Sequence, residues 1–160
     1  MIASTILLPA LRRPLRLAPA ALVLALAVLP APHAQADAPA CRYAVSADTV
    51  PDHDTCLTWQ RAVAASSYTW ASAATYCNNL VLAGPNNWRL PTIQELQTIV
   101  DESRVNPAID TTAFPSTPAQ YFWSSSPYAG DSSDAWVVDF HLGYVYHDDV
   151  GYTYRVRCVR

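Results

Sequence analysis

The apolar residues that follow position 92 recur with the period of an α-helix. They share one face of such a helix, at Ile93, Leu96, Ile99 and Val100. Thr92 and Glu95 stand at the N-cap and N3 positions of a capping box, in which each side chain accepts a hydrogen bond from the other residue's backbone amide. The pattern predicts a helix from Thr92 to about residue 103, which Asn106 and Pro107 end.

An earlier stretch carries a second helical face, formed by Trp70, Ala73, Ala74, Cys77 and Leu80. Thr69 can cap this helix, and the Gly-Pro pair at 84–85 ends it. Pro91 disfavours a helical conformation at the residue before it, so the chain reaches the next helix extended. We expect Trp88 and Leu90, which flank this extended arrival, to be buried beside that helix.

Elsewhere the apolar residues alternate with polar ones, which is typical of half-buried strands. Two short strands with an Asp-rich turn between them are predicted in the stretch 41–61, the second through 57–59. Gly143 supplies a hairpin turn between two later strands. After Pro107 the predicted strands are 121–123, 135–140, 144–146 and 154–158.

Residues 1–36 have the pattern of a signal peptide. Three arginines precede an Ala/Leu/Val run at 17–29, and Ala34 and Ala36 fit a small-x-small cleavage site. The apolar run is shorter than the ~20 residues that a spanning helix needs. We therefore expect cleavage after Ala36, export to the periplasm or cell exterior, and a single mature domain at 37–160; an uncleaved anchor is the alternative.

Removing that segment changes the charge balance of the chain. The whole chain has ten basic and thirteen acidic residues, and the segment takes three of the basic ones, which leaves a net charge of −6. Nucleic acids and anionic lipids need clusters of positive charge, so neither is an expected partner. No membrane span is expected after cleavage, and the sequence does not indicate an oligomeric state.

All four cysteines lie in the mature part, and an even count in a small exported chain indicates two disulfides. Of the three pairings we favour Cys41–Cys56 with Cys77–Cys158. In the last strand Cys158 alternates with the two arginines Arg155 and Arg157, which places its side chain on the apolar face. Pairings of Cys77 or Cys158 with the N-terminal loop remain alternatives.

Metal ligation and catalysis are not expected. The mature part keeps only three histidines and has no Cys-x-x-Cys pair. The carboxylates of Asp48, Asp52 and Asp54 lack the spacing of an EF-hand loop, so a solvated turn is the preferred interpretation. The serines at 124–126 have no G-x-S-x-G elbow and are interpreted as a turn at a strand end. No cofactor is predicted.

A ligand surface is predicted in the C-terminal loops between residues 128 and 152. Tyrosine faces and carboxylate acceptors are what the C–H faces and hydroxyls of sugars require. The competing interpretation is that the tyrosines complete a small core and the aspartates keep the loops soluble. The candidate binding residues are Tyr128, Asp131, Asp134, Tyr144, Tyr146, His147, Asp148, Asp149 and Tyr152.

Several runs of this sequence, from Thr49 to Arg160, resemble the Lcl C-terminal domain, the C-terminal domain of a bacterial collagen-like adhesin that is widespread in secreted bacterial proteins. Cys56 departs from this family, which usually has glycine there. The runs that carry the resemblance are TVPD at 49–52, TCLTWQ at 55–60, Trp70 with Ala73 and Tyr76-Cys77, NWRLPT at 87–92 with Glu95-Leu96, FWSSS at 122–126, WVVDF at 136–140 with Gly143, and RVRCVR at 155–160.

The resemblance implies a C-type-lectin-like α+β fold, with two helices packed on twisted antiparallel strands and a disulfide from the first helix to the final strand. It also implies a module that recognises a glycan or a cell-surface protein. The adhesin's own ligand is an anionic glycosaminoglycan, which a mature chain of net charge −6 matches poorly. The alternatives are an envelope-assembly domain without a small ligand, or an enzyme of the formylglycine-generating fold.

Overall fold

In the computed structural model of the protein, residues 42–160 are described, so the predicted signal peptide and Cys41 lie outside the described residues. Two helices and two antiparallel sheets make up an α+β domain, which is the fold class that the family resemblance implied. The elements are β1 (Thr49–Asp52), β2 (Leu57–Gln60), α1 (Trp70–Asn78), α2 (Ile93–Thr98), β3 (Tyr121–Pro127), β4 (Asp134–Asp139) and β5 (Tyr144–Asp149).

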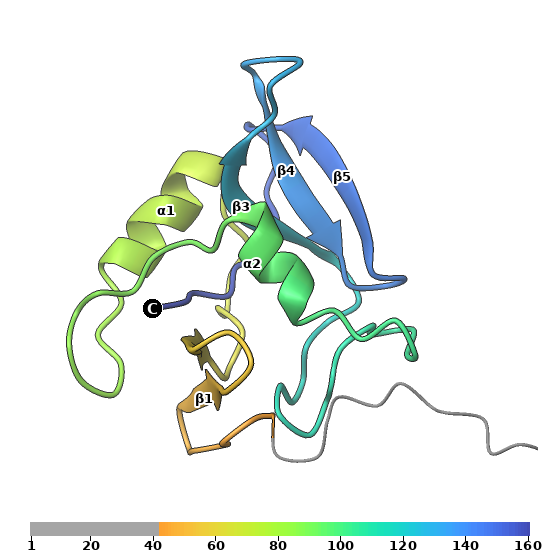
Figure 1. Ribbon diagram of the computed structural model, residues 1–160. Coiled ribbons are helices and arrows are strands. Elements are labelled where there is room, and N and C mark those ends of the chain that lie inside the picture. Colours follow the sequence, from red (N-terminus) through yellow and green to blue (C-terminus); the bar gives the residue numbers. More distant parts are fainter. Residues whose placement is uncertain (1–41) are drawn as a thin grey trace, which may run out of the picture. The chain divides into compact units, whose positions relative to one another are not determined.

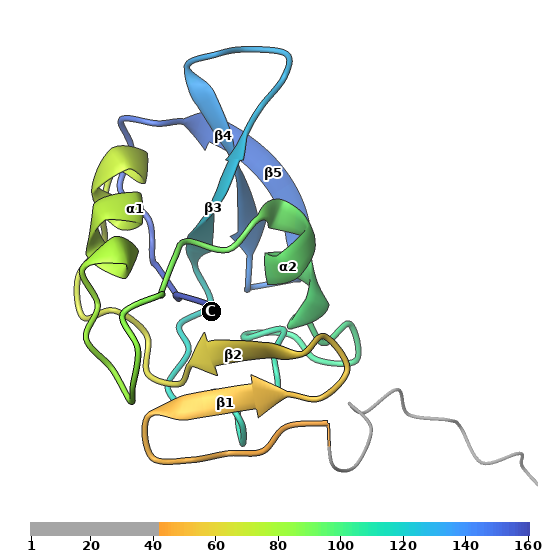
Figure 2. The ribbon, with the colours of Figure 1, turned by 60° about the vertical axis from the view of Figure 1, so that its left-hand side comes forward.

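The three-stranded sheet β3-β4-β5 has a helix against each face (Figures 1 and 2). Side chains alternate between the faces of a strand, so each face builds its own core. On the α1 face, Trp123 and Val137 pack with Cys77. On the α2 face, Phe122 and Val138 pack with the apolar stripe of α2. The predicted hairpin of 135–140 and 144–146 is therefore confirmed, with Val138 opposite Val145.

The predicted capping box begins α2. The Thr92 hydroxyl accepts from the Glu95 amide at 3.2 Å, and the Glu95 carboxylate accepts from the Thr92 amide at 2.8 Å. The same carboxylate accepts two hydrogen bonds from the Arg89 guanidinium at 2.7 and 2.6 Å, a contact the sequence pattern did not predict. Hydrogen bonding to Arg89 keeps the pKa of Glu95 below its usual value. Trp88 and Leu90, on either side of Arg89, are buried as predicted.

Thr92→Ala should lower the free energy of unfolding by about 0.5–2 kcal/mol, because the Glu95 amide loses its acceptor. Chemical denaturation of both proteins measures this. Thr75→Ala is a matched control, since the Thr75 hydroxyl bonds only the Ala71 carbonyl within α1 and its loss should cost less than about 0.5 kcal/mol. Equal losses in the two variants would contradict a stabilising role for the cap.

Both helices are shorter than the periodicity predicted. Helix α2 ends at Thr98 because the Asp101 carboxylate stabilises a turn that competes with the helix. This carboxylate accepts hydrogen bonds from the Ser103 amide and the Arg104 guanidinium. Helix α1 ends at Asn78, well before the Gly-Pro pair, in a run of two asparagines that have low helix propensity. Thr69 is its N-cap residue but makes no capping hydrogen bond.

The serines at 124–126 belong to β3, so their interpretation as a turn was wrong. Ser124 is fully buried, and its hydroxyl donates to the Trp136 carbonyl at 2.7 Å. The Ser126 hydroxyl accepts from the Ile93 amide at 3.0 Å, at the start of α2. Each of these two hydroxyls has a partner across the fold, which lets this polar stretch continue as part of β3.

The last six residues are threaded through the middle of the domain. They form isolated bridges instead of the regular strand predicted: Arg155 pairs with Phe122, and Val159 pairs with both Trp59 and Arg89. The carbonyls of Val156 and Cys158 accept from the backbone of the segment around residues 60–64. The C-terminal segment 155–160 therefore connects β2, β3 and the extended stretch that precedes α2.

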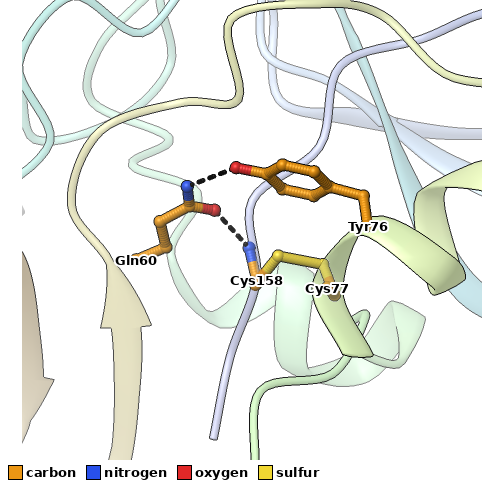
Figure 3. Close-up of a disulfide and its surroundings, with 4 residues drawn as sticks. All are labelled: Gln60, Tyr76, Cys77 and Cys158. Atoms are coloured by element: carbon orange, nitrogen blue, oxygen red, sulfur yellow. Dashed lines mark hydrogen bonds between the residues drawn. A yellow bond between two sulfur atoms is a disulfide. The ribbon is translucent and has the colours of Figure 1, made fainter. Parts of the chain in front are cut away.

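The disulfide between Cys77 and Cys158 joins α1 to this final segment, with a Cα–Cα distance of 5.5 Å (Figure 3). Both cysteines are fully buried. Gln60 lies beside the bridge: its side-chain amide donates to the Tyr76 hydroxyl at 3.0 Å, and its carbonyl oxygen accepts from the Cys158 amide at 3.1 Å. The bridge and Gln60 thus tie together β2, α1 and the C-terminal segment.

Arg157, expected to point away from the core, is 1 % exposed. Its Nη1 donates to the carbonyls of Gln60 at 2.8 Å and Arg61 at 2.6 Å, and its Nη2 donates to the Thr117 hydroxyl at 2.7 Å. The guanidinium also lies 4.6 Å from the centroid of the Phe114 ring. Strand alternation failed here because backbone carbonyls inside the domain accept the guanidinium.

The Asp-rich turn is only partly solvated. Asp52 is buried and accepts two hydrogen bonds from Arg42, at 2.9 and 2.7 Å. Burial alone would raise the pKa of Asp52, but hydrogen bonds from Arg42 and Thr55 lower it overall. Cys56, at the end of the same turn, is exposed and makes no disulfide within the described residues.

The Cys41–Cys56 pairing stays a prediction because Cys41 lies outside the described residues. The neighbouring contact supports it: the Arg42 carbonyl accepts from the His53 amide at 2.9 Å. Residue 42 therefore lies beside the turn that carries Cys56.

Candidate functional site

The predicted binding residues divide between the two faces of the three-stranded sheet. Strand β5 is an edge strand whose side chains alternate, so Tyr144 and Tyr146 lie on the α1 face with Asp148. His147 lies on the α2 face, opposite Trp136 of β4. The single surface expected from the sequence is therefore two separate clusters.

On the α1 face, five tyrosines form a continuous series of neighbouring rings, which we call the tyrosine row. Neighbouring ring centroids are 6.4, 5.2, 6.0 and 6.5 Å apart along the row. The two end rings are the most exposed, at 58 % and 57 %. In order, the members are Tyr152, Tyr154, Tyr121, Tyr146 and Tyr144.

A hollow of about 420 Å³ opens beside two of the three inner rings, Tyr121 and Tyr154. The Asp139 carboxylate and the side chains of Gln120 and Arg155 line it as well. Arg155 is held in place, because its Nε donates to the Gln120 side-chain carbonyl at 2.8 Å and its Nη1 to the Ala65 carbonyl at 3.1 Å. The hollow thus offers a carboxylate, an amide, a guanidinium and two phenol rings within one small volume.

The phenols of Tyr154 and Tyr121 remain protonated at neutral pH because their pKa values are raised. Burial, followed by its hydrogen bond to the Asp148 carboxylate at 2.5 Å, raises the pKa of Tyr154. Desolvation and the nearby charge of Asp139 raise the pKa of Tyr121. These hydroxyls are therefore neutral groups that can donate hydrogen bonds, next to carboxylates that can only accept them.

The cluster on the α2 face is formed by Tyr128, Trp136 and His147. The Tyr128 and His147 rings are stacked with centroids 3.7 Å apart, and the Trp136 ring meets both edge-on. The His147 Nδ1 lies 2.8 Å from the Asp134 carboxylate. These contacts connect the start of the β3–β4 loop to β5, which is a structural use of the residues.

Two further predicted aspartates serve their own loops. Asp131 accepts from the Ser133 amide and hydroxyl at 2.9 and 2.7 Å, and these hydrogen bonds lower its pKa. Asp149 accepts from the Gly151 amide at 2.7 Å. The competing interpretation, in which aspartates stabilise turns, therefore describes these two positions.

A second hollow, of about 740 Å³, runs along α1 and is lined by side chains without charge, including Tyr68, Tyr76 and Leu80.

Within residues 42–160 no group of three or more His, Cys, Asp or Glu side chains is arranged to hold a metal ion. In the same part of the chain, no helix has the length and apolar character needed to cross a membrane.

The sequence pattern did not indicate that the following residues contribute to a site: Tyr121, Tyr154, Asp139, Gln120 and Arg155. Tyr121 and Tyr154 were assigned to strands as apolar residues, although a tyrosine at a strand end often keeps its hydroxyl in water. Asp139 shares a strand face with Val137, and the observed register places that face with Tyr144 and Tyr146. Gln120 and Arg155 gave no such signal, because only the tertiary fold brings them together.

The comparison with protein families agrees with the resemblance noted in the sequence. The family model described as the Lcl C-terminal domain matches residues 48–160, which is most of the chain and includes both sheets, both helices and the disulfide. No curated protein matches the chain. From the extent of that match, the chain belongs to the Lcl C-terminal domain family.

Proposed function

We propose that the domain is a recognition module that binds a neutral carbohydrate through the tyrosine row and the adjoining hollow. The observation that carries this proposal is the series of five tyrosine rings, four of them exposed, beside a hollow lined by Asp139, Gln120 and Arg155. The proposal keeps three of the residues predicted from the sequence, Tyr144, Tyr146 and Tyr152, and adds Tyr121 and Tyr154.

The chemistry of the surface supports a sugar ligand. Aromatic faces contact the apolar C–H faces of pyranose rings, whereas planar polar groups bind their hydroxyls. A hollow of about 420 Å³ is within the size range of small-molecule sites. The carboxylates of Asp139 and Asp148 accept hydrogen bonds from hydroxyls but repel other carboxylates and sulfates.

The proposal includes export and a C-type-lectin-like fold. The basic start and apolar run of the first 36 residues support export to the periplasm or beyond. A disulfide from the first helix to the final segment, and a helix on either side of an antiparallel sheet, are what the fold expected from the family resemblance requires.

Tyr146→Ala should weaken glycan binding about tenfold, a loss of about 1.4 kcal/mol, because Tyr146 contributes a 45 %-exposed ring near the middle of the row. A glycan array identifies the ligand, and calorimetric titration measures the affinities. Tyr128→Ala removes a matched ring on the opposite face and should leave the affinity unchanged.

The melting temperature of each variant is measured in parallel, so that lost binding is separated from lost folding. Equal affinities of the native protein and the Tyr146→Ala variant would exclude the tyrosine row as the site. If the purified protein binds no glycan on the array but captures one envelope protein, the domain would instead be identified as an assembly domain.

A further inference from the structure

We infer that the tyrosine row binds an unbranched chain of several neutral sugar residues, read along its length, and not a single terminal sugar. This inference rests on the proposed function and names the class of ligand. It starts from the spacing of the rings, whose neighbouring centroids are 5.2–6.5 Å apart. Each step is similar to the length of one pyranose unit in an extended polysaccharide.

The position of the hollow along the row indicates that the ligand continues past it. Tyr121 and Tyr154 line the hollow and lie in the interior of the row. Tyr152 lies beyond one side of this pair, and Tyr146 with Tyr144 lies beyond the other. A site for one terminal sugar would leave these outer rings unused, whereas a chain would cross the hollow and contact rings on both sides.

The outer rings are exposed yet held in position. Tyr144 meets Tyr146 at an interplanar angle of 80°, and Tyr146 meets Tyr121 at 80°. Edge-to-face contacts of this kind restrict the rings before any ligand arrives, which reduces the entropy lost on binding. Tyr144 and Tyr146 are thus partly ordered before a sugar chain binds.

The charges beside the row favour a neutral chain. Asp139 lines the hollow and Asp148 holds the Tyr154 hydroxyl, so two carboxylates lie next to the path of the ligand. Arg155 is the single cation that lines the hollow, and two of its nitrogens already donate to protein carbonyls. A polyanion would meet more repulsion than attraction here.

Calorimetric titration of the purified full-length chain with unbranched neutral oligosaccharides of one to six units tests this inference. The probes are β-1,4-linked glucose, β-1,4-linked N-acetylglucosamine and α-1,4-linked glucose. We expect affinity for the matching series to rise by about two- to tenfold for each further ring engaged, up to about four or five units. Tyr144→Ala and Tyr152→Ala should each lower the affinity for the longest oligomer by a larger factor than the affinity for the disaccharide.

The outcomes separate the inference from the proposed function. Equal affinity for the monosaccharide and the hexasaccharide would overturn the inference and leave glycan recognition intact. Array binding that is restricted to branched or terminal sugars would do the same. The absence of binding to every oligosaccharide and every arrayed glycan would overturn both. Loss of affinity for disaccharide and hexasaccharide alike in Tyr152→Ala would place the site at one end of the row and contradict a chain-reading surface.

Discussion

Replacing Cys77 with serine is expected to lower the free energy of unfolding by about 2–5 kcal/mol. The disulfide closes a loop between residues 81 positions apart, and the unfolded chain gains the conformational freedom of that loop when the bridge is absent. Both cysteines are fully buried, so the serine hydroxyl would also enter an apolar cluster. Denaturant unfolding under non-reducing conditions measures the loss.

Two further variants test whether the loss of stability comes from the Cys77–Cys158 bridge. The double variant Cys77→Ser with Cys158→Ser removes the unpaired thiol, and it should be as unstable as the single variant. Cys56→Ser is the matched control, because Cys56 is exposed and its predicted partner Cys41 would close a much shorter loop. A Cys56→Ser variant less stable than Cys77→Ser would contradict the central role of the Cys77–Cys158 bridge.

Arg157→Ala should cost about 3–5 kcal/mol, because buried acceptors lose their donors and a cavity replaces the side chain. Burial lowers the pKa of the Arg157 guanidinium to about 9, so the group is still charged at neutral pH. No carboxylate pairs with it within residues 42–160; two backbone carbonyls and the Thr117 hydroxyl accept its hydrogen bonds. Equilibrium unfolding in urea compares the variants.

Arg157→Lys and Arg157→Met separate the contribution of the hydrogen bonds to this loss from the contribution of the volume that the side chain fills. Lysine keeps the charge but cannot reach the carbonyls and the Thr117 hydroxyl with one planar fork, and methionine fills space without donating. We expect both to be less stable than the native protein and more stable than the alanine variant. An alanine variant within about 0.5 kcal/mol of the native protein would show that the buried guanidinium contributes little.

Features that depend on near neighbours in the sequence were predictable. The capping box at Thr92 and Glu95 is a local contact with a fixed spacing, and it is present as predicted. The alternation of apolar and polar residues in 135–140 and 144–146 predicted the hairpin. A shift of one residue in the register would turn every apolar side chain to the opposite face of the sheet, so the alternation specifies how the two strands pair. The helix ends were wrong where a side chain competed with the helix, as Asp101 does after α2.

Features that depend on distant segments were not predictable from periodicity. Arg157 is buried because its acceptors come from residues 60, 61 and 117, which no local pattern connects to the C-terminus. The nine candidate residues are close in sequence, but strand alternation places those of β5 on opposite faces, so they do not form the single surface that was expected. Tyr121 and Tyr154 joined the row only through the pairing of β3 with the final segment.

The threading of residues 155–160 through the middle of the domain has a consequence for the order in which the chain is made. This segment pairs with backbone near residues 58, 89 and 122, and it supplies one half of the disulfide. These contacts cannot form until residues 155–160 have left the ribosome, since these residues are synthesised after the segments that they contact. Until then, a nascent chain lacks the segment that joins its sheets and helices, and its core cannot close.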